Sequence, residues 1–352
     1  MHCVIIHMGE LKHMKIVVDG YGGDNAPIAI VKACIRAVNE FKDLEIVLTG
    51  KENELKNCLI NNNYTGNQIE VINADDVITC DDENPAMQIK RKPNSSLVIA
   101  LDILKKFDEV VALVSAGSTG AVLSGGFLKI GRIKGVSRPA LAPTLPSKDA
   151  KRGVVLLDCG ANADCKAINL CHFALMGSIY YTQMFGVENP KVALLSIGTE
   201  DAKGKELTKE AFAMLKKLPI NFVGNMEARE LISGKYDVVV SDGFAGNVAL
   251  KATEGAALFV LNTIKESIMK STKAKIGSLF MKDVFKTLKT KLDYHQHGGS
   301  LFLGCKKNIL KAHGDSDENS FFNCIKQAVQ VSQRDINSQI EAELEKLNLE
   351  EE

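Results

Sequence analysis

The chain has 352 residues, in which 43 lysines and arginines balance 43 aspartates and glutamates, so its formal net charge is 0. A neutral chain lacks the bulk positive charge that drives nonspecific nucleic-acid binding, and we expect no nucleic-acid partner. Hydrophobic residues make up 45% of the chain and charged residues 24%, a balance that excludes wholesale disorder and allows a large buried core.

The first 13 residues, MHCVIIHMGELKH, precede the first clear strand pattern and are expected to be an N-terminal extension. They have no basic start and only a short apolar stretch, so they do not form a secretory signal. No apolar run approaches the about 18 residues of a membrane span. We therefore expect a cytoplasmic protein whose nine cysteines, none in a C-x-x-C pair, are reduced thiols.

Short β-branched runs alternate with longer segments of helical period, which is typical of a mainly parallel sheet with helices on both faces. The predicted strands are Lys15–Asp19, Glu45–Leu48, Ile69–Ile72, Val110–Ser115, Val154–Asp158, Val192–Ile197, Asn221–Val223 and Val238–Ser241. The predicted helices are Ile28–Phe41, Ser95–Phe107, Ala167–Phe185 and Lys205–Lys217. We expect one α/β catalytic domain over residues 14–335, followed at 336–352 by an acidic, solvated helix end or tail.

Small, polar, glycine-rich turns follow five of the predicted strands: DGYGGDNAP, SAGSTGA, DCGANAD, SIGTEDAKG and SDGFAGN. In an open parallel sheet such turns lie at the carboxyl edge, where ligands bind and helix starts present backbone N–H groups. One such turn alone is most simply a connection between strand and helix. Five of them together favour a site for a phosphate-type anion.

Several familiar catalytic signatures are absent from the sequence. It contains no P-loop, no G-x-S-x-G and no H-E-x-x-H, and the first turn fails the full dinucleotide fingerprint because Asn25 stands at the third glycine position. Cys159, Cys165, Cys171 and His172 are spaced too widely for a zinc hairpin and are interpreted as core residues. We expect no metal and no cofactor.

Six segments together resemble the acyl-carrier-protein:phosphate acyltransferase family: DGYGGDNAP, SAGSTGA, GRIKGVSRPALAPTLP, GTEDAKGKELTK, GNMEARELISGKYDVVVSDGFAGNVALK and KAHGDSD. The resemblance runs from about Met14 to Arg334. It implies a Rossmann-like fold similar to that of phosphotransacetylases and isocitrate dehydrogenases. It also implies transfer of a fatty acyl group from the thioester of acyl carrier protein to inorganic phosphate, giving acyl phosphate for phospholipid synthesis.

That reaction suits the sequence, because phosphate is already an anionic nucleophile and needs no Ser-His-Asp relay. On the family match, Lys203 is expected to supply charge, Asn247 an amide donor, and His313 a hydrogen-bond donor to phosphate or a proton for the leaving thiolate. The expected substrate-binding residues are those of the strand-end turns: Gly22, Gly23, Asp24, Asn25, Gly117, Ser118, Thr119 and Asn162. Taken singly, Lys203 is more often a solvated loop lysine, Asn247 also fits a cap of the helix that follows it, and His313 is equally a buried structural histidine.

One region departs from charge neutrality: eight lysines against Glu266 and Asp283 lie between Lys265 and Lys291. Apolar residues at helical spacing are interleaved with them, which predicts a basic amphipathic helical hairpin over about residues 262–294, with its turn near Ile276–Ser278. Family members are homodimers that associate peripherally with membranes. The hairpin is therefore expected to serve a homodimer interface, an anionic membrane surface or acyl carrier protein, and the membrane glycerol-phosphate acyltransferase is a further expected partner.

Two other classes of function stay open at this point. One is another enzyme of similar fold, either a phosphotransacetylase acting on acetyl-CoA or a dehydrogenase. The other is a non-enzymatic scaffold at a membrane surface, in which the glycine-rich edge only binds an anion.

Overall fold

The structure is a computed structural model that describes residues 14–347 except 80–81, 83, 149–151, 286–287 and 289–297. The expected N-terminal extension at 1–13 lies outside the described residues. Two compact units are found where the sequence predicts one domain: unit 1 contains Met1–Gly131 and Cys305–Gln333, and unit 2 contains Arg132–Gly304 and Arg334–Glu352. The chain crosses between them three times, which is why no linker composition marks the boundary.

The sheet of unit 1 is parallel throughout, in the order β3-β2-β1-β4-β11. Its strands are β1 Met14–Asp19, β2 Leu44–Gly50, β3 Ile69–Asn73, β4 Val110–Ser115 and β11 Asn308–Lys311. The central strands are near-continuous apolar runs, with Ile16, Val17 and Val18 fully buried, as expected for a sheet covered on both faces.

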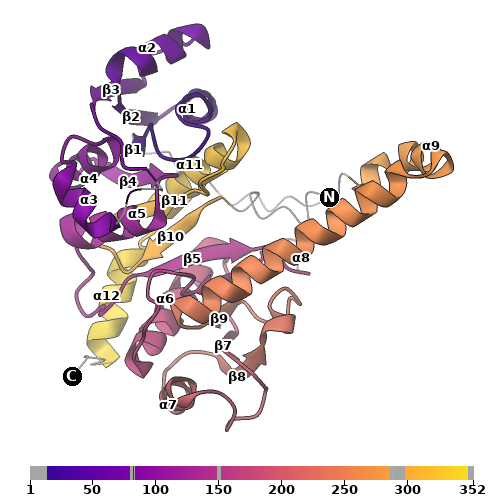
Figure 1. Cartoon of the computed structure of the whole chain (residues 1–352). Helices are drawn as coiled ribbons and strands as arrows, with labels where there is room; N and C mark the ends of the chain where they lie inside the picture. Colours follow the sequence, from indigo (N-terminus) through magenta and orange to yellow (C-terminus); the bar gives the residue numbers. More distant parts are fainter. Residues whose placement is uncertain are drawn as a thin grey trace. The chain divides into compact units, whose positions relative to one another are not determined.

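The helices of unit 1 cover both faces of this sheet (Figure 1). They are α1 Ile28–Glu40, α2 Glu52–Asn61, α3 Pro85–Arg91, α4 Ser96–Lys106, α5 Thr119–Gly125, the π-helical η1 Gly126–Ile130 and α11 Glu318–Ser332. Helices α1 and α11 pack against each other, while α4 packs on β1, β2 and β4. The predicted helices 28–41 and 95–107 are confirmed within a residue of each end.

The sheet of unit 2 has the order β10-β5-β6-β9-β7-β8, and only the pairs β10–β5 and β5–β6 are antiparallel. Its strands are β5 Ala140–Leu145, β6 Val154–Leu157, β7 Val192–Ser196, β8 Phe222–Glu227, β9 Val238–Val240 and β10 Ser300–Leu303. Its helices are α6 Ala167–Phe185, α7 Glu206–Leu215, the 3-10 turn η2 Ala228–Glu230, α8 Gly243–Met269, α9 Thr272–Phe280 and α12 Ile336–Leu347. The predicted α/β class with a mainly parallel sheet is confirmed.

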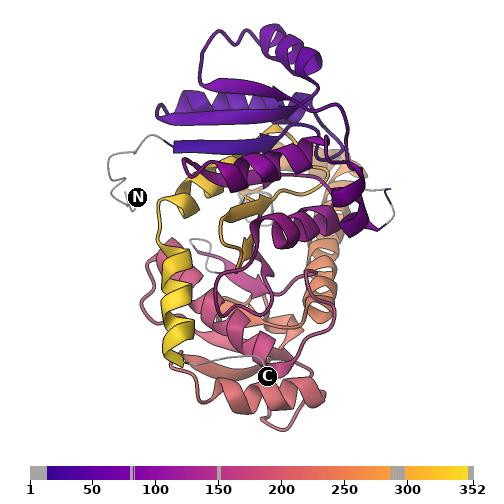
Figure 2. The same ribbon diagram turned by 90° about the vertical axis from the view of Figure 1, so that its left-hand side faces the viewer.

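The C-terminal segment differs from the solvated tail that the sequence predicts. Helix α12 packs on α6, and Ile336, Ile340 and Leu344 are at most 3% exposed (Figure 2). These residues are four apart, so they form one apolar stripe, while the acidic residues lie on the other faces. The acidic composition concealed this stripe.

The predicted hairpin turn is also in the wrong place. Helix α8 ends at Met269, and α9 begins directly after Ser271, whose side chain caps it by accepting from Ala274 N at 3.3 Å. Helix α9 continues through Ile276–Ser278, because an interior glycine such as Gly277 costs a helix only about 1 kcal/mol. The stretch 289–294 of the expected hairpin lies outside the described residues.

Candidate functional site

Unit 1 gathers three turns at the carboxyl ends of β1, β4 and β11. Asp19 at the end of β1 is 2% exposed and accepts hydrogen bonds from Ser115 Oγ at 2.7 Å and Tyr21 N at 3.3 Å. Ser115 Oγ in turn accepts from Gly117 N at 3.0 Å. Burial raises the pKa of Asp19 above its ordinary value, and its hydrogen bonds oppose that rise. One buried carboxyl therefore joins two of the predicted turns.

The β1 and β4 turns meet so closely that only glycine fits. A Cβ on Gly22 would lie 2.5 Å from Gly117 N. The β11 turn is held from the other side, because Asp24 N donates to Gly314 O at 2.7 Å. The amide of Asn25 donates to Asp315 O at 2.9 Å and Ser316 O at 3.3 Å, so its role in the fold is to position this turn.

The β11 turn carries His313, which is half-buried beside these glycine-rich segments. Lys311, the last residue of β11, is 8% exposed, and its Nζ donates to Ala116 O at 3.3 Å and to Ala312 O. A buried lysine side chain thus contacts the β4 turn. Ser118 is the N-terminal flanking residue of α5 and Thr119 its first residue, both half-buried.

Unit 2 repeats this arrangement around Asp158, the fully buried residue that follows β6. Its Oδ1 accepts from Leu141 N at 2.9 Å and Ala161 N at 3.2 Å. Its Oδ2 accepts from Asn162 N at 2.7 Å and Asn162 Nδ2 at 2.9 Å. Burial raises the pKa of Asp158, and these N–H donors oppose the rise. Asn162 Nδ2 also donates to Pro139 O, just before β5, at 2.8 Å, so its amide group joins the turn to that segment.

Helix α8 starts against this turn. Asp242 caps it by accepting from Ala245 N at 2.8 Å, and Gly243 N donates to Asn162 O at 2.8 Å. A Cβ on Gly246 would overlap Asp158 O, which explains the second glycine of SDGFAGN. Asn247 is half-buried on the next turn of the helix, where its Nδ2 lies 3.4 Å from the position of a Cβ on Gly160.

The turn after β7 carries two lysines with different surroundings. Lys205 Nζ lies 2.6 Å from Asp242 Oδ2, and Asp242 is almost fully buried. Lys203 is exposed, with its backbone held by a hydrogen bond from its N to Glu200 O at 3.0 Å and one from Ser196 Oγ to its O at 3.3 Å. The Lys205–Asp242 pair therefore fastens the Lys203 turn to the start of α8.

The cysteines beside this site are poor nucleophiles. Burial raises the pKa of the Cys165 thiol to about 11 and that of Cys171 to about 12, and the pKa of Cys159 well above its usual range. His172 is fully buried, with Nδ1 3.1 Å from Ser137 Oγ. Within the described ranges, no three His, Cys, Asp or Glu side chains are grouped as a metal site would require.

The predicted site residues fall into two clusters, each inside one unit. Unit 1 holds the residues of the turns that follow β1, β4 and β11: Gly22, Gly23, Asp24, Asn25, Gly117, Ser118, Thr119 and His313. Unit 2 brings Asn162, Lys203 and Asn247 to one edge. Their roles in binding and catalysis remain predictions. Sequence reasoning missed four residues that lie inside quoted motifs: Asp19, Asp158, Lys205 and Asp242. Nothing local distinguishes a buried aspartate that accepts hydrogen bonds from an exposed turn aspartate, or a paired lysine from a solvated one.

Helix α8 leaves much apolar surface uncovered. It has 27 residues, its most apolar window has a mean hydropathy of 1.2, and 17% of that window is buried. By length and composition it would suffice to cross a membrane, contrary to the expectation from the sequence. A helix of a globular protein can pass the same test, and the first turns of α8 pack in unit 2. Phe259, Met269, Ile276 and Phe280 of α8 and α9 are 57–88% exposed.

Comparison with known proteins places the chain in a family. The family described as "Fatty acid synthesis protein" matches residues 14–339. The phosphate acyltransferase of Clostridium novyi is 48% identical over 332 residues, covering 94% of this chain and 99% of that protein. The phosphate acyltransferase of Bacillus cereus is 44% identical over 336 residues, covering 96% and 100%.

Solved structures share the fold at low sequence identity. A phosphotransacetylase from Streptococcus pyogenes matches with a TM-score of 0.60 at 17% identity, covering 91% of this chain and 94% of its own. The EutD phosphotransacetylase from Staphylococcus aureus matches with a TM-score of 0.59 at 17% identity, covering 92% and 94%. The fold expected from the sequence is thus confirmed, and the chain belongs to the fatty acid synthesis protein family as one of its phosphate acyltransferases.

Proposed function

We propose that this chain transfers a fatty acyl group from the phosphopantetheine thioester of acyl carrier protein to inorganic phosphate, producing acyl phosphate for phospholipid synthesis. The observation that carries the proposal is its near-full-length identity to phosphate acyltransferases. The glycine-rich strand ends support it, since backbone N–H groups and lysines at such an edge favour a tetrahedral anion.

The chemistry needs positioning more than activation. A phosphate oxygen attacks the thioester carbonyl carbon, a C–O bond forms, the C–S bond breaks, and the thiolate leaves and takes up a proton. Phosphate is anionic at neutral pH, so no base is needed, and the poorly ionised Cys165 and Cys171 fit direct transfer without an acylated cysteine. What the protein supplies is orientation and stabilisation of the oxyanion.

The described contacts support distinct roles for the predicted residues. Lys203 is exposed on a fixed backbone and provides positive charge toward phosphate. Asn247 provides a neutral amide donor to the oxyanion, and His313 protonates the leaving thiolate or donates to phosphate. The side-chain amides of Asn25 and Asn162 donate hydrogen bonds to neighbouring carbonyl and carboxylate oxygens, so these residues position the turns. The turns that contain Gly22, Gly23 and Gly117 hold anionic oxygens through backbone N–H groups other than that of Gly117, which donates to Ser115 Oγ.

Thiol release from acyl carrier protein in the presence of phosphate tests the proposal. Lys203→Ala and Asn247→Ala are each expected to lower kcat/KM about 100-fold, as for loss of one oxyanion-stabilising group, with an unchanged circular-dichroism spectrum. Lys209→Ala on the exposed side of α7 is the matched control and should leave activity intact. Full activity in both site variants would refute these roles, and turnover with acetyl-CoA alone would identify a phosphotransacetylase instead.

We also propose the setting in which the enzyme works. It is cytoplasmic and peripherally membrane-associated, acts as a homodimer, and hands acyl phosphate to the membrane glycerol-phosphate acyltransferase. The exposed apolar residues of α8 and α9, together with Lys270, Lys273 and Lys275, support contact with an anionic lipid surface or a second copy. The same lysines suit an acidic carrier protein.

A further inference from the structure

Asn225 of β8 is a buried polar residue that contacts the turn of Lys203. It is 5% exposed, and its Nδ2 donates to Glu200 O at 2.9 Å. Its Oδ1 is buried as well, and no described residue donates a hydrogen bond to it. We propose that Asn225 is a positioning residue for acyl transfer, which holds the backbone from which Lys203 reaches phosphate; this inference rests on the proposed function.

The hydrogen bond from Asn225 reaches the middle of this turn. Glu200 O accepts from Lys203 N at 3.0 Å as well as from Asn225 Nδ2, so one carbonyl oxygen joins the turn to β8. On the other side of the lysine, Ser196 Oγ donates to Lys203 O at 3.3 Å. The serine contact is exposed to water, whereas the asparagine is buried, so Asn225 gives the more persistent restraint.

The side chain of Lys203 takes its direction from this backbone. A Cβ on Gly198 would lie 3.0 Å from Lys203 Cγ and 3.4 Å from Lys203 Cδ, so the aliphatic stem crosses directly over Gly198. The stem packs on the turn itself, and a movement of the turn would carry the ammonium group with it. Misplacing a positioned group by about 1 Å can lower the rate about 100-fold.

An irregularity in β8 places Asn225 beside the turn. Val192 of β7 pairs with Phe222 of β8. Two residues further on, Leu194 pairs with Asn225, so β8 has one residue more than β7 over this stretch, as in a β-bulge. Gly224 within it has a φ of +100°, a conformation that glycine adopts readily. A bulge changes the direction of the side chains that follow it, and here Asn225 follows directly.

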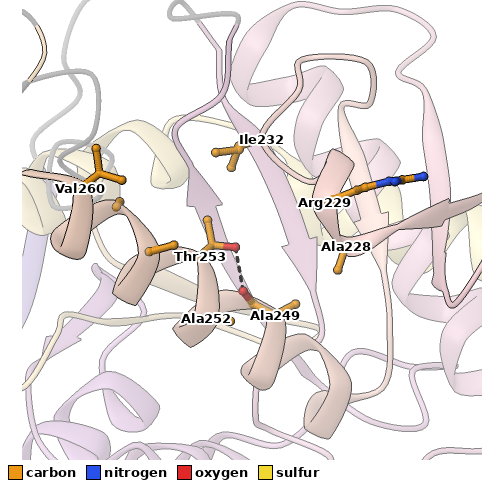
Figure 3. A pocket seen from close by; sticks show the side chains of 9 residues that line it. Ala228, Arg229, Ile232, Ala249, Ala252, Thr253 and Val260 are labelled. Carbon is orange, nitrogen blue, oxygen red and sulfur yellow. Dashed lines mark hydrogen bonds between the residues drawn. The ribbon is translucent and has the colours of Figure 1, made fainter.

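A purely structural role does not explain the buried Oδ1. A buried acceptor without a donor lowers stability, and an apolar side chain of the same shape would avoid that cost. The groove of about 430 Å³ between α8 and the segment after β8 has two polar lining residues, and both have other partners (Figure 3). Arg229 extends away from α8 and donates to Glu227. Thr253 Oγ1 donates to Ala249 O at 2.8 Å. Asn225 therefore costs unit 2 stability, which is expected of a residue that serves the reaction.

Replacing Asn225 by leucine separates the two roles. Asn225→Leu removes the donor and the unpartnered acceptor together, while Glu200 O keeps Lys203 N as its donor. We expect the KM for inorganic phosphate to rise about tenfold and the KM for acyl carrier protein to change less than about twofold, with the midpoint of denaturant unfolding unchanged or higher. Asn225→Ala cannot overpack and should shift the phosphate KM in the same way.

The matched control lies just before the same strand. Asn221 Nδ2 donates to Asn189 O at 3.1 Å, so Asn221→Leu also removes a bond from an asparagine side chain to a backbone carbonyl, but away from the Lys203 turn. It should leave both KM values unchanged. An unchanged phosphate KM in Asn225→Leu and Asn225→Ala would overturn the proposal.

A double-mutant cycle shows whether Asn225 acts through Lys203. In a chain that carries Lys203→Ala, Asn225→Leu should lower kcat/KM less than about twofold further. An equal loss in both backgrounds would overturn the proposal.

Amide hydrogen exchange tests the positioning without turnover. Peptides that contain residues 198–205 should exchange faster in Asn225→Leu than in the parent chain and in Asn221→Leu, and unchanged exchange would overturn the proposal. A parent chain that makes no acyl phosphate would refute the proposed function, whereas faster exchange would still support Asn225 as the residue that positions Lys203.

Discussion

Two buried aspartates organise the strand-end turns at the scale of single residues. Asp19 is the last residue of β1, and Asp158 directly follows β6. Each lies beside a serine from a neighbouring strand end: Ser115 is the last residue of β4, and Ser241 directly follows β9. Ser115 Oγ donates to Asp19, and Ser241 Oγ donates to Asp158 O at 3.2 Å. Both carboxyls accept hydrogen bonds from the backbone of their own turn. Both are buried, and their hydrogen bonds hold the backbone of these turns.

Asp158→Asn should be far more damaging than its small size change implies. Both carboxylate oxygens accept two N–H donors each, and an asparagine would turn its own NH₂ toward one of those pairs. We expect the free energy of unfolding to fall by about 3 kcal/mol, as for other buried charged acceptors lost from a network, measured by calorimetry or denaturant titration.

The matched control is Asp164→Asn, an exposed aspartate of the same turn, which should change the free energy of unfolding by less than about 0.5 kcal/mol. Equal stability of the two variants would contradict the role given to Asp158. The sequence predicts that the DCGANAD turn binds a ligand, but its first residue, Asp158, has a structural role. Only its burial distinguishes a structural from a ligand-binding aspartate, and the residues that bury it belong to β5 and α8, outside the motif.

At the scale of elements, one helix connects the two halves of the unit 2 site. Helix α8 begins at Asp242, which both caps it and pairs with Lys205 of the β7 turn. Its second turn carries Asn247. A shift in the start of α8 therefore moves Asn247 and the turn of Lys203 together.

Asp242→Ala tests this coupling. Loss of the cap should cost about 1 kcal/mol of stability, and loss of the partner frees Lys205 and with it the turn of Lys203. We expect kcat for acyl phosphate formation to fall about tenfold or more, beyond what the stability change accounts for, in steady-state assays well below the melting temperature.

Ser271→Ala removes a cap from α9 and is the control, since Ser271 accepts from Ala274 N and lies outside the site. It should leave kcat unchanged. A similar kcat in both variants would show that Asp242 acts only as a helix cap.

The sequence predicted elements well where one periodicity dominates and poorly where tertiary context decides. Helix α6 is predicted at its exact bounds because it combines a long apolar pattern with Gly186 at its end. Strands β10 and β11 have four residues each, too few to show a period, and β5 contains Pro143, which argues against a strand. The split into two units was missed because the chain passes between them repeatedly.

At the scale of the whole molecule, the same device appears twice. Unit 1 has a parallel sheet and unit 2 a partly parallel one; in both, strand ends carry glycine-rich turns held by a buried aspartate, and each unit contains part of the predicted site. Only unit 2 adds the long helix with its exposed apolar and basic residues. The anion chemistry could be anticipated from motifs, whereas the lysine-rich region showed only that an amphipathic surface exists.

Replacing Ile276 and Phe280 together by Glu tests the use of that surface. These side chains are 57% and 88% exposed, so the change should not disturb folding, but it places two charges where apolar contact with lipid or a second copy is expected. We expect flotation with anionic vesicles, or dimerisation in analytical ultracentrifugation, to weaken about tenfold while acyl transfer in solution is retained.

A second variant, Lys273→Glu with Lys275→Glu, keeps the apolar residues and reverses only the charge. If the surface binds lipid, this pair should also weaken flotation, and the parent's binding should fall as salt rises past about 0.15 M. If the surface is a dimer interface, the pair should spare dimerisation and only the Ile276–Phe280 variant should sediment as a monomer. Unchanged behaviour of that variant in both assays would contradict a role for α9 in either association.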